Sequence, residues 1–447
     1  MKKLLKRIVI ALLVCAVLPL AAWITFNLFD DTIDPKAAAY GEPRASAVPD
    51  AENGYFAAIA MSAPDGVDGM KYASAWVAEA RAAAKENRRE NRAPVERAKR
   101  LDICDAAQAS CVAAVRGDAS GVAAKLDPYR EDMARYEKLL AFRRYEEILD
   151  YPMRLDAQIP QYQGISHTQR AYLLRAALAF QSGNVEEGLS MLEREFAFQR
   201  VMREGTRTLI GKMIAHALYQ RDLCFVLDVL QHFPAELRPH AARLTAMMQP
   251  VNVAALRMDR VFESEFAFVK QAYKFPSAGE QLREGLIFEF ASWSIGYKKN
   301  ATLNKAYEIY SAMAAASLKP ASSVSAEWKK VPMVSGELSL RDYFDNPIGK
   351  VLLGVANPAF DGYVLRMHDL DAFNRLVGLR VQMLAEDVGA EGAAAFVANA
   401  DARFHDPYTG KPMGWDAASK RLSFKPSEAT AKRKLIYLDQ GRLFAQL

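Results

Sequence analysis

The clearest pattern along the chain is an uncharged stretch of 22 residues from Ile8 to Phe29. A helix of this length spans roughly 33 Å, about the thickness of one hydrocarbon core. The stretch follows four basic residues, Lys2, Lys3, Lys6 and Arg7. Because basic flanks stay in the cytoplasm, the pattern predicts a single transmembrane helix, with inner-membrane lipid contacting residues 8–29 and the remaining chain across the membrane.

Two other interpretations of this segment are weaker. A cleaved signal peptide needs small residues at positions −3 and −1, but Leu20-Ala21-Ala22 places leucine at −3 and the apolar run continues to Phe29. A lipoprotein would use Cys15, which follows Val14 and not a small residue. We therefore expect an uncleaved anchor in a bacterial inner membrane and a periplasmic body.

After the anchor, apolar positions recur mostly at helical spacing. The clearest unit is Ala171–Arg203, which resembles one tetratricopeptide-type hairpin, with Gly183 ending one helix and Asn184 capping the next. A fainter copy places Arg221 at the position of Gly183, 38 residues later. The predicted fold class is therefore mainly α, with stacked, α-solenoid-like helical hairpins behind the transmembrane helix.

The chain divides into five predicted regions, of which the first, residues 1–29, comprises the cytoplasmic flank and the transmembrane anchor. Residues 30–52 contain three prolines and are interpreted as a linker. Residues 53–160 and 161–400 are expected to form an N-terminal helical region and the helical-hairpin body. Residues 401–447 differ, because Met413–Trp415 and Arg421–Phe424 indicate a β-hairpin and Leu435–Leu438 a further strand.

Cys104 and Cys111 are predicted to form a disulfide, since the periplasm is oxidising. On one straight helix their Cα atoms would lie roughly 10 Å apart, whereas a disulfide needs about 7 Å or less. The pair therefore predicts a bend between them. Cys224 lies in an apolar helical pattern and is expected in the core.

The net charge of the chain indicates its orientation in the membrane more than its function. The formal charge of the 447-residue chain is +5, from 58 basic and 53 acidic residues, but residues 1–29 supply four basic residues and no acidic one. The remaining chain has a net charge of +1. The basic run Lys85–Arg100 is interrupted by three glutamates and is interpreted as a solvated helical face, so no nucleic-acid partner is expected.

Common catalytic signatures are missing, including G-x-S-x-G, H-E-x-x-H and the phosphate-binding and dinucleotide-binding glycine motifs. The best enzymatic candidates are Glu263 and Glu265 in Glu263-Ser264-Glu265-Phe266, which resembles the Glu-Ser pair of lytic transglycosylases. Such an acid needs a raised pKa in a partly apolar cleft, which nearby phenylalanines could supply. The Gly-Leu-Met-Gln element of that family is absent, and an amphipathic helix is the favoured interpretation.

Two histidine–aspartate clusters offer partial metal sites, His368-Asp369-Leu370-Asp371 and His405-Asp406. Neither has a third ligand at a suitable spacing, so no metal or other cofactor is expected. His368 is interpreted as a helix start capped by an aspartate, and His405-Asp406 as part of a turn. The aromatic residues Trp293, Tyr297, Tyr307 and Tyr310 are interpreted as core, although a groove lined by them would suit a peptide or glycan.

Three short stretches carry a further resemblance: Asn300-Ala301-Thr302-Leu303-Asn304, Asn346-Pro347-Ile348-Gly349-Lys350, and Asp406-Pro407-Tyr408-Thr409-Gly410-Lys411-Pro412. In this order, behind an anchor, they resemble an uncharacterised family of proteobacterial membrane-anchored envelope proteins. The resemblance implies no activity.

The sequence favours a membrane-tethered periplasmic helical protein that acts as a non-enzymatic scaffold or binding protein. Its partner would be another envelope protein or a peptide, held on the concave surface that stacked hairpins provide. The competing hypothesis is a peptidoglycan-acting glycosidase using Glu263 or Glu265 as the acid.

Overall fold

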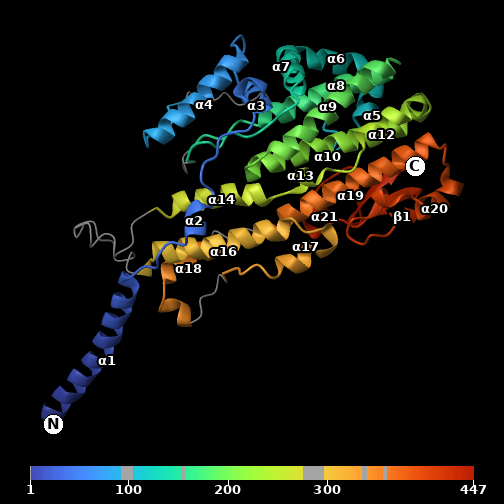
Figure 1. Ribbon diagram of the computed structural model, residues 1–447. Helices are drawn as coiled ribbons and strands as arrows, with labels where there is room; N and C mark the ends of the chain where they lie inside the picture. The colour runs from blue at the N-terminus through green and yellow to red at the C-terminus, as the bar shows by residue number, and fades with distance from the viewer. Residues whose placement is uncertain (1, 92–103, 153–156, 275–295, 335–339, 356–359) are drawn as a thin grey trace.

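The computed structural model describes residues 2–91, 104–152, 157–274, 296–334, 340–355 and 360–447 (Figure 1). Its most separate element is α1 (Lys2–Leu28), which projects from the helical body and runs through Pro19 without ending. Within it, the 24 residues Leu5–Leu28 are long and apolar enough to cross a membrane, and an 18-residue window among them has a mean hydropathy of 2.7. The chain therefore has one N-terminal helix suited to single-pass anchoring, as the sequence predicts.

The first part of the body is a group of short helices covering one side of a longer stack. They are α3 (Gly54–Ala60), α4 (Gly69–Lys85), α5 (Cys111–Gly117), α6 (Ala119–Leu126) and α7 (Arg130–Leu140). The predicted disulfide is confirmed: Cys104 and Cys111 are bonded, with Cα atoms 5.5 Å apart. Cys104 lies in the turn that precedes α5, which supplies the expected bend. Cys224 is buried and free.

The stack consists of α8 (Gln163–Gln181), α9 (Val185–Gly205) and α10 (Leu209–His232). The predicted hairpin between α8 and α9 is confirmed, because Gly183 has φ +79° and the Asn184 side chain accepts the Glu187 N–H. The fainter second copy is wrong. Helix α10 is continuous through Arg221, so no turn forms there. The Arg221 guanidinium donates to Asp105 at 2.8 Å.

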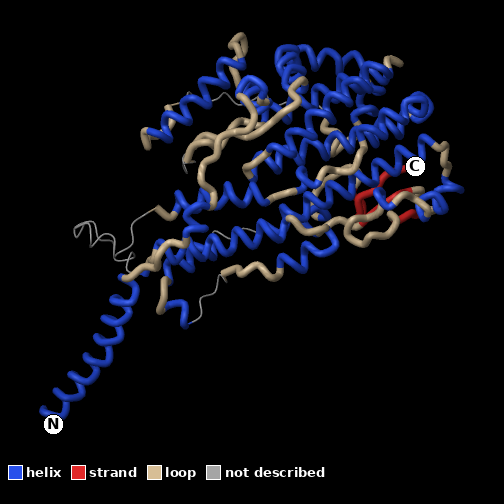
Figure 2. The backbone as a smooth tube through the Cα atoms, in the orientation of Figure 1, coloured by secondary structure: helices blue, strands red, loops and turns tan. Residues whose placement is uncertain are grey.

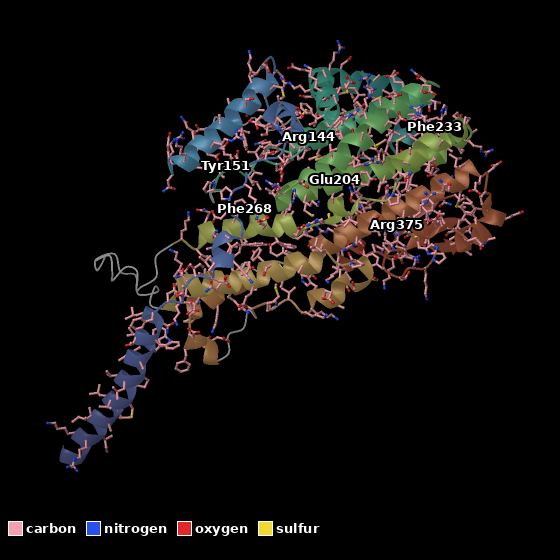
Figure 3. All side chains as sticks on the ribbon, viewed as in Figure 1. Arg144, Tyr151, Glu204, Phe233, Phe268 and Arg375 are labelled. Atoms are coloured by element: carbon pink, nitrogen blue, oxygen red, sulfur yellow. A yellow bond between two sulfur atoms is a disulfide. The ribbon has the colours of Figure 1, made fainter. Side chains whose placement is uncertain are left out.

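A second hydrophobic core forms around α14 (Asp259–Ala272) and α16 (Lys299–Ser317), which lie side by side. Two shorter helices, α17 (Ala321–Trp328) and α18 (Pro347–Val355), pack beside α16. The long helix α19 (Phe360–Ala385) joins the two cores. Its first residues, such as Phe360 and Val364, belong to the second core, and from Leu370 onward it belongs to the first. Figure 3 shows side chains filling the space between these helices.

The strands gather at the C-terminal end, as Figure 2 shows in red. The predicted β-hairpin is confirmed as β1 (Gly414–Asp416) and β2 (Arg421–Phe424), paired antiparallel. The sheet also contains β3 (Leu438–Asp439) and β4 (Arg442–Gln446), in the order β1-β2-β4-β3. Leu422, Phe424, Leu443 and Ala445 face the first core, so the sheet closes one end of it. The remaining short helices are α2 (Pro35–Ala39), α11 (Pro234–Leu237), α12 (Ala241–Met247), α13 (Val253–Leu256), α20 (Ala390–Ala398) and α21 (Glu428–Ala431).

Residues 30–52, interpreted from composition as a linker, instead pack along the body. Asp34 caps α2, and the Tyr40 ring lies 5.4 Å from the rings of both Phe266 and Tyr307. Further along, Glu146 accepts hydrogen bonds from Ser46 Oγ at 2.7 Å and from the Ala47 N–H at 2.8 Å. The prolines of residues 30–52 therefore belong to an extended segment that is held against the body by residues far away in the sequence.

The start of this segment forms a joint with α16. Asp30 accepts the N–H groups of Asn300 (2.7 Å) and Ala301 (3.1 Å), which places a negative charge at the helix N-terminus. The sequence pattern before Thr302 predicts Asn300 as the N-cap, but Asn300 lies within the first turn of α16 and donates its side-chain N–H to Asp31 O. Asn304 bonds similarly to Thr32 O at 3.0 Å. Two of the three stretches that carry the family resemblance, 300–304 and 346–350, thus begin with asparagines that bind the chain at or just after α1.

Prolines and a serine cluster predict an extended connection over residues 317–345, but this segment contains α17 and the 3₁₀ turn η6 (Leu340–Tyr343). The sequence pattern also predicts a helix over Ala278–Ser294 and a helix break near Asn357-Pro358, and both lie outside the described residues.

Candidate functional site

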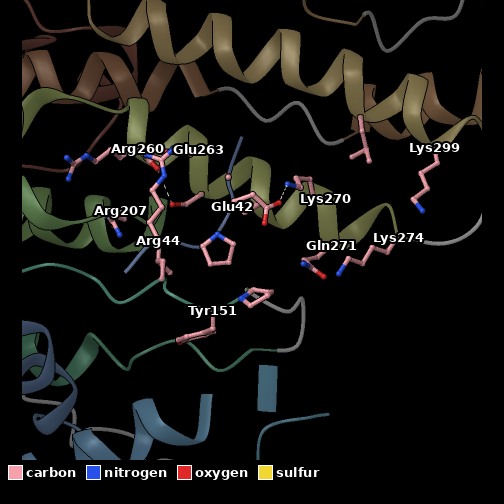
Figure 4. Close-up of a pocket in the computed structure, with 17 residues that line it drawn as sticks. Glu42, Arg44, Tyr151, Arg207, Arg260, Glu263, Lys270, Gln271, Lys274 and Lys299 are labelled. Atoms are coloured by element: carbon pink, nitrogen blue, oxygen red, sulfur yellow. Dashed lines mark hydrogen bonds and ion pairs between the residues drawn. The ribbon is translucent and has the colours of Figure 1, made fainter. Parts of the chain in front are cut away.

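One cleft has a volume of about 330 Å³ and is lined by five separate parts of the chain (Figure 4). These parts are residues 41–44, residues 149–152, Arg207 before α10, the facing side of α14, and the start of α16. The cleft therefore lies where the docked segment after α2 crosses between the two cores.

Helix periodicity explains how α14 contributes to the cleft. Lining residues recur three or four positions apart, at Arg260, Glu263, Ala267 and Lys270. The opposite face holds Phe262 and Phe266, which are fully buried in the second core. One helix thus has an apolar side that fixes its position and a polar side that faces the cleft.

The lining is strongly cationic. Six basic side chains, Arg44, Arg207, Arg260, Lys270, Lys274 and Lys299, accompany two acidic ones, Glu42 and Glu263. Both acids are already paired within the cleft: Glu263 lies 2.6 Å from Arg44, and Glu42 accepts a hydrogen bond from Lys270. Arg207 pairs with Glu146 at 3.1 Å. Arg260 and Lys274 are solvent-exposed, so the cleft presents positive charge to any ligand that enters.

The two candidate catalytic glutamates lie in different surroundings. Glu263 lines the cleft in its ion pair with Arg44. Glu265 accepts the Leu209 N–H at 3.4 Å on the side facing α10, and burial raises the pKa of its carboxyl group against the opposing effect of that hydrogen bond. Glu265, whose pKa is raised, does not line the cleft.

The histidine–aspartate clusters are partly brought together. His368 and Asp371 on α19 and His405 and Asp406 line another cavity, of about 460 Å³. His368 lies mid-helix and not at a helix start, and both ring nitrogens of His405 contact backbone carbonyls of Gly410 and Ala400. Within the described residues no three His, Cys, Asp or Glu side chains are grouped to hold a metal ion.

Asp369, adjacent to His368, serves a structural purpose. Its carboxylate accepts hydrogen bonds from Tyr408 Oη at 2.6 Å and from Ser427 N and Oγ, at 2.9 and 2.5 Å. It therefore fixes the turn before β1 and the start of α21 onto α19.

The aromatic candidates lie in the second core. Tyr297 and Tyr310 are buried, and Tyr307 packs edge-on against Tyr40. Trp293 lies outside the described residues. Tyr307 therefore helps to hold Tyr40 in place, and none of Tyr297, Tyr307 and Tyr310 lines the cationic cleft.

A second polar cluster is buried inside the helical stack. Gln169 Nε2 donates to Glu195 Oε1 at 3.0 Å and to Asp222 Oδ1 at 2.7 Å, and both carboxyl groups are fully buried. Burial raises the pKa of both acids, and the charge of Glu195 raises that of Asp222 further. This cluster is a feature of the core, since none of the three residues lines a cavity described above.

Sequence reasoning missed Arg44, Arg207 and Arg260 as site residues. They come from three segments separated by 163 and 53 positions, and each stands among ordinary polar residues. The one local signal was the helical spacing of polar side chains between Arg260 and Lys270.

No protein-family model, curated protein or solved structure matches this chain. Fold and cleft together define a mainly helical protein with one N-terminal helix able to span a membrane and a cationic cleft in its body. The interpretation of the cleft follows from its own geometry and charge.

Proposed function

We propose that the protein is a membrane-tethered periplasmic binding protein of the cell envelope, without catalytic activity of its own. Its cationic cleft would hold an acidic segment of another envelope protein. The observation that carries the proposal is the excess of basic side chains lining the cleft, six against two, in a body whose overall charge is nearly balanced. Electrostatic complementarity of this kind selects partners and speeds their association.

The anchor supports the same function. The basic residues in the first turns of α1 favour a cytoplasmic N-terminus, and the Cys104–Cys111 disulfide suits an oxidising compartment. The helix continues past Leu20-Ala21-Ala22 to Leu28, which favours an uncleaved anchor. Tethering would raise the local concentration of the cleft near membrane-associated partners.

A photo-crosslinking amino acid placed at Gln271, which lines the cleft, tests the proposal in intact cells. We expect a reproducible acidic partner. Its capture should fall about tenfold in the Arg260→Glu/Lys274→Glu variant, which corresponds to a loss of about 1.4 kcal/mol in binding free energy. Raising the ionic strength should also weaken capture, since exposed charges are screened.

The matched control is Lys125→Glu/Arg200→Glu, which reverses two exposed charges on α6 and α9, away from the cleft. Its capture should equal that of the wild type. Recovery of no reproducible partner, or equal capture by all three proteins, would contradict the proposal.

The glycosidase hypothesis retains one observation in its favour, the position of Glu263 in the cleft. The same carboxyl group is already paired with Arg44 at 2.6 Å, so a glycosidic oxygen would have to displace that ion pair to reach it. Peptidoglycan hydrolysis by the wild type that is lost in Glu263→Gln would establish this function in place of the binding function.

A further inference from the structure

The outer end of α1 is bonded to a distant segment of the body, residues 343–346. Trp23 Nε1 donates to Tyr343 O at 2.8 Å, and Asn27 Nδ2 donates to Phe344 O at 2.9 Å. In return, the Asn346 N–H donates to Asn27 Oδ1 at 3.0 Å. Asn27 is only 1% exposed. These contacts hold residues 343–344 at the same level as the last turns of α1.

The side chains at this level are aromatic and exposed. Tyr343 and Phe344 are 56% and 61% exposed, and Phe26 and Phe29 at the end of α1 are 56% and 71% exposed. Figure 1 shows the short orange segment before α18 next to the outer end of α1. Aromatic side chains from two distant parts of the chain thus continue the apolar surface of the anchor.

Charged residues border this aromatic group on the body side. Lys298 Nζ pairs with Asp345 at 2.8 Å and lies 4.2 Å from the centre of the Phe26 ring, and Lys350 pairs with Asp342 at 3.1 Å. Membrane proteins commonly place aromatic rings beside an apolar span, with charged groups beyond the rings, where the chain passes from the hydrocarbon core to the lipid headgroups.

We propose that Tyr343 and Phe344 insert into the headgroup–acyl boundary of the leaflet from which the body emerges. The lipid bilayer is the partner of this surface, because the surface is continuous with the helix that crosses that bilayer. The inference rests on the proposed anchoring by α1. It gives the body a second membrane contact, and its residues are bonded to residues of α1 that precede them by 320 and 317 positions.

The test uses the full chain in liposomes of phosphatidylethanolamine and phosphatidylglycerol. In a Cys15→Ser background, spin labels are attached singly at Tyr343→Cys, Phe344→Cys, Val17→Cys and Val253→Cys. Collisions with oxygen report apolar surroundings, and collisions with an aqueous nickel chelate report water. Val253 on α13 is the matched control, since it is an apolar residue 70% exposed on the body.

We expect the oxygen-to-nickel ratio at 343 and 344 to exceed that at 253 several-fold and to lie below that at 17. A ratio at 343 and 344 equal to that at 253, with 17 reading as hydrocarbon, would overturn the second contact and leave the anchoring intact. Shielding of 343 and 344 from both reagents, with spin–spin broadening, would assign the surface to a second copy of the chain and also overturn it. A label at 17 that reads as aqueous would overturn the anchoring itself.

Discussion

Two buried carboxyl groups, Asp105 in the segment before α5 and Asp222 in α10, differ in their response to pH. Burial acts to raise the pKa of Asp105, but Arg221 at 2.8 Å and Arg170 at 2.6 Å lower it overall. Among the described residues Asp222 Oδ2 has no hydrogen-bond partner, and burial together with the Glu195 charge raises the pKa of Asp222. The interior therefore contains one acid that stabilises the fold when ionised and one that destabilises it.

The sign of each effect follows from linkage. A carboxyl group whose pKa is raised by folding keeps its proton longer in the folded state, so its contribution to stability falls as pH rises above the unfolded value of about 4. A carboxyl group whose pKa is lowered contributes stability above that value and loses it as pH falls through the folded value. Asp222 follows the first case and Asp105 the second.

We therefore expect Asp222→Asn to raise the free energy of unfolding at pH 7 by on the order of 1 kcal/mol and to reduce the loss of stability between pH 4 and 7. Asp105→Asn should lower it at pH 7 by about 3–5 kcal/mol, because Arg221 would stay buried without its carboxylate. Denaturant unfolding of the protein in detergent, measured across pH, distinguishes the two. Destabilisation by Asp222→Asn at pH 7 would contradict the assignment.

At the scale of elements, the turn between α8 and α9 depends on one backbone conformation. Gly183 has φ +79°, and a Cβ atom there would meet no neighbour within 4 Å. We expect Gly183→Ala to lower the free energy of unfolding by about 1 kcal/mol through backbone strain alone. Gly117→Ala, also in open space but within α5 at an ordinary φ, should leave stability unchanged or raise it. Equal effects in the two variants would exclude strain as the cause.

Local signals made this turn predictable, since glycine, the N-cap asparagine and the apolar spacing all lie within a few residues. The same kind of signal failed at Arg221, where the copy of the hairpin turn is replaced by continuous helix. Its guanidinium pairs with Asp105, 116 positions earlier, and nothing near Arg221 in the sequence indicates that partner. The cationic cleft could not be predicted from the sequence for the same reason. Its basic side chains come together only because α14 packs against the segment after α2.

At the scale of the whole molecule, the cysteines report the compartment of the body. The chain has one disulfide and two free thiols, Cys15 in α1 and Cys224 in the core. Denatured without reductant, the full chain should show two reactive thiols, and four after reduction. Four thiols before reduction would place the body in a reducing compartment and contradict the periplasmic orientation.

Helix α19 couples the unfolding of the two hydrophobic cores. Phe360 and Val364 at its start pack in one hydrophobic core, whereas Phe373 and Leu376 further along pack in the other. Unfolding of this helix from either end exposes apolar side chains of the core at that end. Because the helix is continuous, loss of its backbone hydrogen bonds in one core destabilises the part that packs in the other core. The two cores should therefore unfold as one cooperative transition in the membrane-anchored protein, and amide protons along α19 should exchange only through that global event.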